Sequence, residues 1–353
     1  MKKVLVVATS RKTRGGITSV VKAHETGEQW NKFHCKWIET HRDGNLAMKL
    51  WYLFTALIEY ILILPFYDIV HIHIATTQSA RRKKLFYLLA RLMKKKIIFH
   101  FHPSNEKFLF EKNVNTLYRQ LFNNADKILV LSEQWIRWLE EALGEGVWRD
   151  KIQVLYNPCP IVRRDSNYKK KQILFAGTLM RRKGYDVLLR AFGKIANKYP
   201  DWTVAFAGVP NGEDGFDGLE DGKKICSELN ITNQVKWLGW ISGESKERVF
   251  NESSIYCLAS EGEGFPMGIL DAWAYGLPCV MTPVGGIPDI VKNNVEGLIF
   301  PVGDVDSLAN AIERMICYKE LRESIISSSD KLVYNEFNIK NICRKLEDIY
   351  TRI

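Results

Sequence analysis

The 353-residue chain is 46% hydrophobic and 25% charged, a composition typical of soluble globular proteins that excludes a mainly disordered chain. Its length favours two domains over one. The net charge of +10 is concentrated in the first half, because residues 1–164 hold 27 Lys and Arg against 14 Asp and Glu.

Neither the cysteines nor the N-terminus indicates secretion. Seven cysteines without a C-x-x-C pair encode neither a disulfide framework nor a thiolate zinc site. The apolar run at residues 4–9 is too short for a signal peptide, and no small-residue cleavage site follows it. We therefore expect a cytoplasmic protein whose chain begins with a buried strand.

In the first half, apolar β-branched runs alternate with segments of helical period, which is typical of an α/β domain with a mostly parallel sheet. The predicted strands are 3–9, 68–74, 96–101, 127–132 and 151–158, and the predicted helices are 16–29, 79–93, 111–123 and 133–143. The proline- and charge-rich segment 157–171 then predicts an interdomain connection.

A second α/β series follows. Its predicted strands are 172–177, 202–208, 234–240, 254–260, 278–282 and 297–300, and its predicted helices are 184–198, 219–229, 244–252, 266–275, 305–317 and 338–351. We expect two Rossmann-like domains with parallel sheets facing across a cleft, over residues 1–160 and 161–337. Residues 338–353 form a closing helix that can pack back on the first domain. Ligands of such sheets bind beyond the carboxyl ends of the strands.

Two segments bear on membrane contact. Residues 50–66 are long and apolar, but Glu59, Pro65 and their marginal length favour a helix packed on the sheet over a membrane span. In residues 80–96, basic residues flank an apolar helix, which suits an anionic membrane surface. A solvated basic rim on an ordinary amphipathic helix explains the same pattern.

The segment 260–280 carries the most specific chemical pattern. Pro266 suits the first position of a helix, and Gly276 with Pro278 suits its end. Because this helix follows a strand, the unpaired N–H groups of Met267 and Gly268 are expected to point out of the sheet edge. A helix N-terminus there favours an anion such as a diphosphate.

Two acids flank this anion site, Glu263 in the preceding loop and Asp271 in the second turn of the helix. Acids beside an anion site fit a role in accepting hydrogen bonds from sugar hydroxyls. The alternative is a loop charge at Glu263 and a partner of the helix dipole at Asp271.

The loop 177–184 follows a strand and opens a helix, with Arg182 and Lys183 available as cations. Cations at this position fit recognition of a leaving diphosphate, and a surface basic cluster is the alternative. Gly15 and Gly16, between the first strand and a helix, let backbone N–H groups approach a phosphate. No G-x-G-x-x-G dinucleotide fingerprint is present.

All seven histidines lie within the first 102 residues, and each of two strands carries an alternating pair. His71 with His73, and His100 with His102, each share one face of a strand. A metal site is one interpretation and satisfied core histidines are another; we favour the latter, because no carboxylate lies at a matching spacing.

A divalent metal held by D-x-D is not expected either. The triplet at Asp304 and Asp306 begins a helix, where N-capping explains it. We therefore predict no bound metal and no cofactor.

The chain resembles glycosyltransferase family 4, retaining enzymes of the GT-B fold, through motifs along its whole length. These are T-R-G-G-I-T-S-V-V at 13–21, D-I-V-H-I-H at 68–73, F-H-F-H-P-S at 99–104, F-A-G-T-L-M-R-R-K-G at 175–184, the G-F-P-M-G segment between Glu263 and Asp271, and G-G-I-P-D-I-V at 285–291.

The resemblance implies that the N-terminal domain binds the acceptor and the C-terminal domain the nucleotide sugar. It assigns Glu263 to the transferred sugar and Asp271, where the family has Glu, to the ribose. Thr178 stands where relatives have Arg, so Lys183 is the main phosphate ligand and Arg181 or Arg182 the substitute guanidinium.

The same resemblance adds Gly15, Gly16, Thr178, Phe265, Met267 and Gly268 to the donor site. It places His102 at the donor's sugar and phosphates and His73 on the acceptor side, so that Glu263, His102 and Lys183 are the catalytic candidates.

The expected function is transfer of a sugar, with retention, from a UDP- or GDP-sugar to a hydroxyl of a saccharide or lipid-linked acceptor. This fits surface-polysaccharide or lipopolysaccharide biosynthesis on the inner face of an anionic membrane. The alternatives are a nucleotide-sugar epimerase or phosphorylase of the same fold, or a basic nucleic-acid-binding protein. No nucleic-acid-binding module is recognisable in the sequence, so nucleic acid is not an expected partner.

Overall fold

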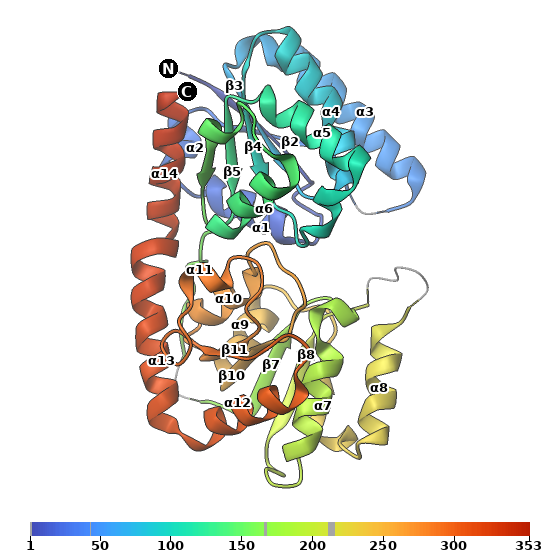
Figure 1. The fold of residues 1–353 in the computed structure, drawn as a ribbon, viewed down its shortest axis with the longest axis vertical. Coiled ribbons are helices and arrows are strands. Elements are labelled where there is room, and N and C mark those ends of the chain that lie inside the picture. Colours follow the sequence, from blue (N-terminus) through green and yellow to red (C-terminus); the bar gives the residue numbers. More distant parts are fainter. Residues whose placement is uncertain (1, 43, 166–167, 211–215) are drawn as a thin grey trace. The chain divides into compact units, whose positions relative to one another are not determined.

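The computed structural model describes residues 2–42, 44–165, 168–210 and 216–353, which form two compact units (Figure 1). Unit 1 consists of residues 1–158 together with residues 336–353, and unit 2 consists of residues 159–335. The chain therefore returns to unit 1 for its last helix, and each unit has its own sheet.

Unit 1 is built on a six-stranded parallel sheet with the order β2-β1-β3-β4-β5-β6. The strands are β1 (Val4–Ala8), β2 (Lys36–Glu39), β3 (Ile69–Ile74), β4 (Lys96–Phe101), β5 (Lys127–Val130) and β6 (Ile152–Val154). The helices are α1 (Gly16–Glu25), α2 (Glu28–Lys32), α3 (Leu46–Ile63), α4 (Thr77–Leu92), α5 (Lys112–Asn123), α6 (Glu133–Leu143) and α14 (Ile339–Arg352). β1 and β3 are buried along their whole lengths, as expected for parallel strands covered on both faces.

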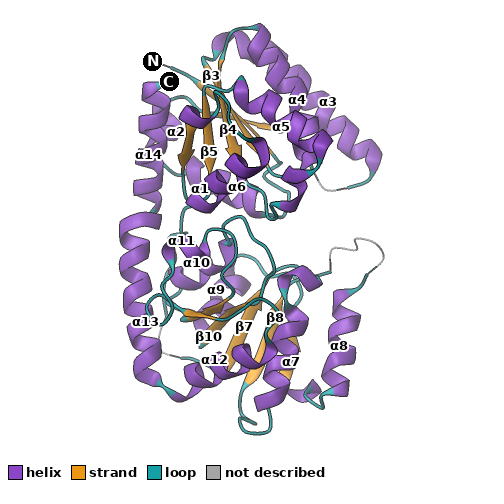
Figure 2. Cartoon of the chain, viewed as in Figure 1, coloured by secondary structure: helices purple, strands orange, loops and turns teal. Residues whose placement is uncertain are grey.

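Unit 2 has a second six-stranded parallel sheet, with the order β12-β11-β10-β7-β8-β9. The strands are β7 (Gln172–Ala176), β8 (Thr203–Ala207), β9 (Val235–Trp237), β10 (Ile255–Leu258), β11 (Cys279–Met281) and β12 (Leu298–Ile299). The helices are α7 (Tyr185–Ile195), α8 (Gly218–Glu228), α9 (Glu244–Glu252), α10 (Met267–Ala274), α11 (Ile287–Ile290), α12 (Val305–Cys317) and α13 (Lys319–Leu332). Helices pack around the strands of each sheet (Figure 2).

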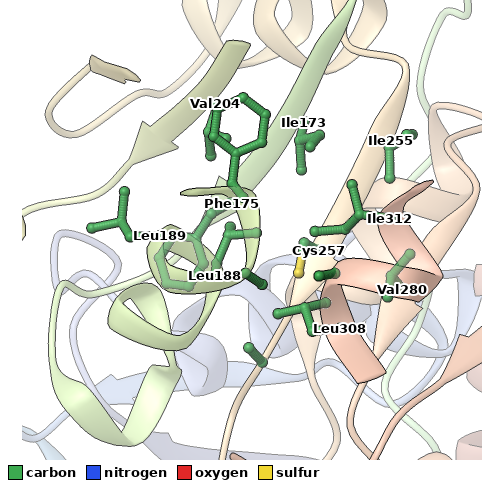
Figure 3. Packing of buried hydrophobic residues seen from close by; sticks show 14 of the residues in the cluster. Ile173, Phe175, Leu188, Leu189, Val204, Ile255, Cys257, Val280, Leu308 and Ile312 are labelled. Atoms are coloured by element: carbon green, nitrogen blue, oxygen red, sulfur yellow. The ribbon is translucent and has the colours of Figure 1, made fainter. Parts of the chain in front are cut away.

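The core of unit 2 lies between its sheet and the helices α7 and α12. Phe175 from β7 and Val204 from β8 lie beside Leu188 of α7, and Leu308 and Ile312 of α12 complete the cluster (Figure 3). These side chains are fully buried or nearly so. At roughly 1.5–3 kcal/mol per buried large apolar side chain, such packing holds the loops at the end of the sheet in place.

The strand order of unit 2 puts a topological switch point between β7 and β10. From β7 the chain continues to β8 and β9 on one side, then returns to β10 on the other side. The loops that leave the carboxyl ends of these two adjacent strands therefore run in opposite directions, which is where ligands of open α/β sheets bind. Loops 177–184 and 259–266 are these two loops.

One strand of unit 1 was not predicted, and the last helix lies in this unit, where the sequence allowed it to pack. β2 was not predicted, because four residues with a charge at each end give a weak strand signal. The last helix, α14, belongs to the core of unit 1, where Ile342, Leu346 and Tyr350 pack with Val4 of β1. The chain passes from unit 1 to unit 2 after residue 158 and returns to unit 1 at residue 336. The sequence predicted these boundaries after residue 160 and at residue 338.

Helix α3 packs on the rest of unit 1 through few residues. Ala56 and Tyr60 are buried, the Tyr60 hydroxyl donates to the Phe86 carbonyl at 2.9 Å, and Glu59 pairs with Lys36 at 2.7 Å. Within the described residues, Leu46–Phe66 is the one segment long and apolar enough to cross a membrane, judged by length and composition alone. Its mean hydropathy is 1.6, and 11% of it is buried.

Candidate functional site

The loops after β7 and β10 meet through an ion pair between two predicted site residues. The Lys183 Nζ lies 2.6 Å from the Glu263 Oε1, and the Ser260 hydroxyl donates to the same oxygen at 2.7 Å. The Glu263 side chain is 7% exposed and that of Lys183 is 21% exposed. A carboxylate and an ammonium group are thus held together at the switch point, screened from most of the solvent.

Backbone contacts fasten the two loops to each other. The Arg182 guanidinium donates to the Gly262 carbonyl at 2.5 Å, and the Glu261 N–H donates to the Arg182 carbonyl at 2.8 Å. Gly184 has a φ of +71°, and a Cβ there would lie 2.0 Å from the Ala259 carbonyl oxygen. Only glycine permits both this backbone conformation and this approach, so Gly184 sets the distance between the loops.

A third loop supports the backbone at Glu263. Gly285 has a φ of +59°, and a Cβ there would lie 2.3 Å from the Glu263 carbonyl oxygen. The N–H of the next residue, Gly286, donates to the Gly264 carbonyl at 3.0 Å. The sequence G-G-I-P-D at 285–289 therefore holds loop 259–266, called the acidic loop because it carries Glu263, in position.

Helix α10 begins and ends close to the predicted residues. Pro266 is its N-cap, one position before the place predicted for it. At the other end Gly276, with a φ of +67°, and Leu277 donate to the carbonyls of Trp273 and Ala272, which is the Schellman arrangement. Phe265, just before the helix, is buried.

The N-terminus of α10 keeps unpaired donors. Among the described residues, none accepts a hydrogen bond from the backbone N–H of Met267 or Gly268, and both residues are partly exposed. Gly268 also packs closely, since a Cβ there would lie 2.1 Å from the Tyr256 hydroxyl oxygen. The Tyr256 hydroxyl in turn donates to the Ala176 carbonyl at the end of β7, at 3.2 Å. These contacts bring the helix start next to β7.

Asp271 has a partner that the sequence did not reveal. The Lys246 Nζ of α9 lies 2.7 Å from the Asp271 Oδ1, and the Asp271 side chain is 16% exposed. Burial raises the pKa of Asp271, and the nearby Lys246 ammonium opposes that shift. Lys246 is 25 positions away in a polar helix, so no motif links the two residues.

Arg181 and Arg182 of loop 177–184 contact different partners. Arg181 extends to α8, where its guanidinium lies 3.2 Å from the Asp221 carboxylate and over the Phe216 ring. Arg182 stays at the acidic loop, which leaves it as the guanidinium nearest Glu263. Thr178 contributes its carbonyl to the Met180 N–H at 3.0 Å.

In unit 1, Gly15 and Gly16 open helix α1. Gly15 is its N-cap with a φ of +153°, and a Cβ there would meet no atom within 4 Å. His73 and His102, also in unit 1, lie side by side, with 3.0 Å between the His73 Nδ1 and the His102 Nε2. Burial lowers the pKa of both imidazoles well below the usual range, so both are neutral at pH 7.

Unit 1 also contains a cavity of about 660 Å³ that sequence reasoning missed. Aromatic and charged side chains from β2, α1, α2, α3 and the loop after β1 line it. The Arg11 guanidinium stacks over the Trp37 ring at 4.4 Å and is held by ion pairs to Glu25 and Glu39. The pair Trp37 and Glu39, which share one face of β2, was the available sequence signal.

The capping role predicted for Asp304 is confirmed. Its carboxylate accepts from the Ser307 N–H at 2.9 Å as the N-cap of α12.

Two family models together match residues 32–332. Residues 32–163 match the model described as Glycosyltransferase Family 4, and residues 162–332 match the one described as Glycosyl transferases group 1. The chain belongs to the family 4, group 1 glycosyltransferases. The boundary between the two matches falls near the boundary between unit 1 and unit 2.

Curated relatives of this glycosyltransferase carry related names. An uncharacterized glycosyltransferase of Methanocaldococcus jannaschii is 28% identical over 57% of the chain, and the match spans 54% of that relative. The UDP-Gal:alpha-D-GlcNAc-diphosphoundecaprenol alpha-1,3-galactosyltransferase of Escherichia coli is 26% identical over 80% of the chain and 75% of the relative.

Solved structures show that the glycosyltransferase has the two-domain, Rossmann-like GT-B fold. HepE of Anabaena, solved with UDP and glucose, superposes with a TM-score of 0.77 at 17% identity, covering 100% of both chains. The sucrose-phosphate synthase of Thermosynechococcus elongatus superposes with a TM-score of 0.79 at 17% identity, covering 100% of this chain and 99% of that one.

Proposed function

We propose that this glycosyltransferase moves a sugar from a nucleotide diphosphate sugar to a hydroxyl of a saccharide or lipid-linked acceptor, with retention at the anomeric carbon. The observation that carries the proposal is the pairing of Lys183 with Glu263 at the switch point of unit 2. A cation for the diphosphate and an acid for the sugar stand there next to each other.

The donor's phosphates have two sets of ligands in unit 2. The free N–H groups of Met267 and Gly268 favour an anion, and the Lys183 ammonium adds a full charge. A diphosphate competes with Glu263 for Lys183. Once Lys183 turns to the phosphates, the Glu263 carboxylate is free to accept hydrogen bonds from the sugar hydroxyls.

Asp271 is the proposed ligand of the ribose. The Lys246 ammonium now occupies one of its oxygens, Oδ1. The other oxygen remains for a ribose hydroxyl, and the shared Lys246 keeps the carboxylate ionised against the cost of burial. The side chain, shorter than the family's glutamate, is therefore fixed in place by Lys246.

In the proposed reaction the bond between the anomeric carbon and the phosphate oxygen breaks, and the acceptor oxygen bonds to the anomeric carbon on the same face. The leaving phosphate takes the acceptor's proton. Negative charge grows on the diphosphate, and Lys183 with the α10 N-terminus stabilises it. The cation for this step comes from the chain, so we propose that catalysis needs no divalent metal and no cofactor.

The acceptor is proposed to reach unit 1 at an anionic membrane surface on the cytoplasmic side. The exposed apolar face of α3 includes Leu50, Trp51, Phe54 and Leu62. It suits insertion into the lipid interface, while the basic residues of the neighbouring α4 suit anionic headgroups. Vesicles with and without anionic lipid test this. A Trp51→Glu, Phe54→Glu variant is expected to lose binding, and retention of binding would contradict the proposal.

The donor chemistry is tested with a panel of UDP- and GDP-sugars and saccharide or lipid-linked acceptors, assayed with EDTA. Glu263→Gln is expected to lower kcat/KM by roughly 100-fold or more. The matched control is Glu261→Gln, on the same loop but exposed, which should leave the rate unchanged. Equal loss in both variants, or a requirement for added Mg²⁺, would contradict the proposal. Sugar conversion without an acceptor would favour an epimerase.

A further inference from the structure

We propose that His71, His73 and His100 in the interior of unit 1 bind a transition-metal ion of the zinc type. This site is separate from the diphosphate site of unit 2, and the ion has a structural role. The inference is independent of the proposed sugar transfer, in which no step uses a metal.

The sheet brings these histidines together. His71 and His73 are two positions apart on β3, so their side chains share a face. His73 is the register partner of His100 on the neighbouring β4. One ring nitrogen from each of the three residues can be chosen so that all lie within 4.8 Å of one another. His24 of α1 completes the surroundings, with its ring 6.1 Å from that of His100.

The cluster leaves buried nitrogens without hydrogen-bond partners. Among the described residues, no partner is present for the Nε2 of His71, the Nε2 of His73 or either ring nitrogen of His100, all in fully buried side chains. A neutral imidazole always carries one N–H, so His100 has an unpaired donor in either tautomer. Satisfied core histidines, the interpretation favoured from the sequence, do not describe this arrangement. A bound ion supplies a partner for one lone pair on each ring, while the remaining His100 N–H still has none among the described residues.

Two of the three rings are already oriented as metal ligands usually are. The His71 Nδ1 lies 2.7 Å from the Tyr350 hydroxyl, and the His73 Nδ1 lies 3.0 Å from the His102 Nε2. In each case a partner on Nδ1 leaves Nε2 free and fixes the ring. Metal-ligating histidines commonly have such a partner on the second nitrogen.

The donor set selects the kind of ion. Three imidazoles suit Zn²⁺, Cu²⁺ or Ni²⁺, whereas Mg²⁺, Ca²⁺ and Mn²⁺ prefer oxygen ligands. Because the three nitrogens lie within 4.8 Å of one another, zinc–nitrogen bonds of about 2.0–2.1 Å require them to approach by up to about 1.5 Å on binding. A water or hydroxide is the natural fourth ligand.

The three rings are neutral donors, and one positive charge lies beside them. Full burial of each imidazole disfavours its charged form, which leaves a lone pair on each ring. Lys83, whose Nζ donates to the His73 carbonyl, places a positive charge beside the cluster.

The test measures metal in the full chain, purified without a polyhistidine tag. Elemental analysis of protein dialysed against Zn²⁺ is expected to give about one bound ion per chain. Co²⁺ should produce a tetrahedral visible absorption band, and Zn²⁺ should raise the Tm while Mg²⁺ does not. A chain that takes up no Zn²⁺ and shows no Tm shift would overturn the proposal and leave buried water as the occupant.

Variants locate the ion. His71→Gln and Tyr350→Phe are each expected to weaken Zn²⁺ binding by more than about tenfold. His34→Asn, an exposed histidine with a φ of +42°, is the matched control and should bind as the parent does. Undiminished Zn²⁺ binding by His71→Gln and Tyr350→Phe would place the ion elsewhere and overturn the proposal. Should His71→Gln fail to fold, Tyr350→Phe and the Co²⁺ spectrum of the parent still decide.

Discussion

At the scale of single residues, each carboxylate of the candidate site forms an ion pair with a lysine. Glu263 has Lys183 as its partner, and Asp271 has Lys246. The first pair joins two residues that the motifs had already marked, although the motifs did not show that they touch. The second pair was beyond prediction, because Lys246 reaches Asp271 only through the packing of α9 beside α10.

The proposed contact of Asp271 with the ribose predicts that nucleotide binding weakens in acid. Because burial raises its pKa, the carboxylate takes up a proton at a higher pH than an ordinary aspartate does. Nucleotide binding is therefore expected to weaken as the pH falls through that raised pKa. Titration calorimetry from pH 7.5 to pH 4.5 measures this. In Asp271→Asn the affinity should be low and flat over the same range, and an unchanged pH profile would remove Asp271 from the ribose contact.

At the scale of elements, sequence patterns and packing contributed differently. The apolar runs predicted β1, β3, β4 and β7, and the proline and glycine signals placed α10 to within one residue. β2 and α13 escaped because a four-residue strand and a polar helix have weak patterns. The position of loop 285–286 under Glu263 depends on tertiary contact, which no local pattern encodes.

Gly285 is expected to control the placement of the acidic loop. Gly285→Ala forces a Cβ toward the Glu263 carbonyl at an unfavourable φ, so we expect a loss of about 1–3 kcal/mol in the free energy of unfolding and lower activity. Gly303→Ala is the control, because its φ of +75° is similar but no atom lies within 4 Å of the new Cβ. Urea unfolding compares them, and equal losses would show that the contact with Glu263 is unimportant.

The buried histidines of α1 and β3 make unit 1 sensitive to acid. Burial lowers the pKa of His24 to about 4 and of His71 to about 3, below the ordinary value near 6.5. Their contribution to stability is complete above about pH 6.5, where both states are neutral, and is lost as the pH falls toward 4 because the unfolded chain binds more protons.

Urea unfolding of chelator-treated protein measures this loss. Each such histidine is expected to remove up to about 1.4 kcal/mol per pH unit below pH 6.5. His71→Gln should have a shallower pH dependence than the parent. A free energy of unfolding that does not change between pH 7 and pH 5 would contradict neutral burial of the cluster.

At the scale of the whole molecule, the chain ends in the unit where it began. α14 closes the unit 1 core with Ile342, Leu346, Ile349 and Tyr350. The sequence predicted this helix and allowed it to pack back on the first domain, while its neighbours Val4 and Phe33 required the three-dimensional structure. Stability of unit 1 is thus tied to a segment that follows all of unit 2 in the sequence.

Leu346→Ala is expected to destabilise unit 1 by about 2–5 kcal/mol, because it leaves a cavity at a side chain that is 1% exposed. Lys345→Ala, the neighbouring surface position, should change the free energy of unfolding little. Calorimetry with nucleotide present separates unit 1 from unit 2, whose transition should stay in place. Loss of the unit 2 transition alone would contradict this assignment of α14.

The proposed binding of the donor's diphosphate by Lys183 and the α10 N-terminus within unit 2 is measured by titration calorimetry with UDP and GDP. We predict that the parent chain binds one of these nucleotides, that Lys183→Met weakens this binding by more than about tenfold, and that Lys194→Met, an exposed lysine on α7, does not. Equal affinity of the parent and Lys183→Met, or no binding of either nucleotide to the parent, would contradict it.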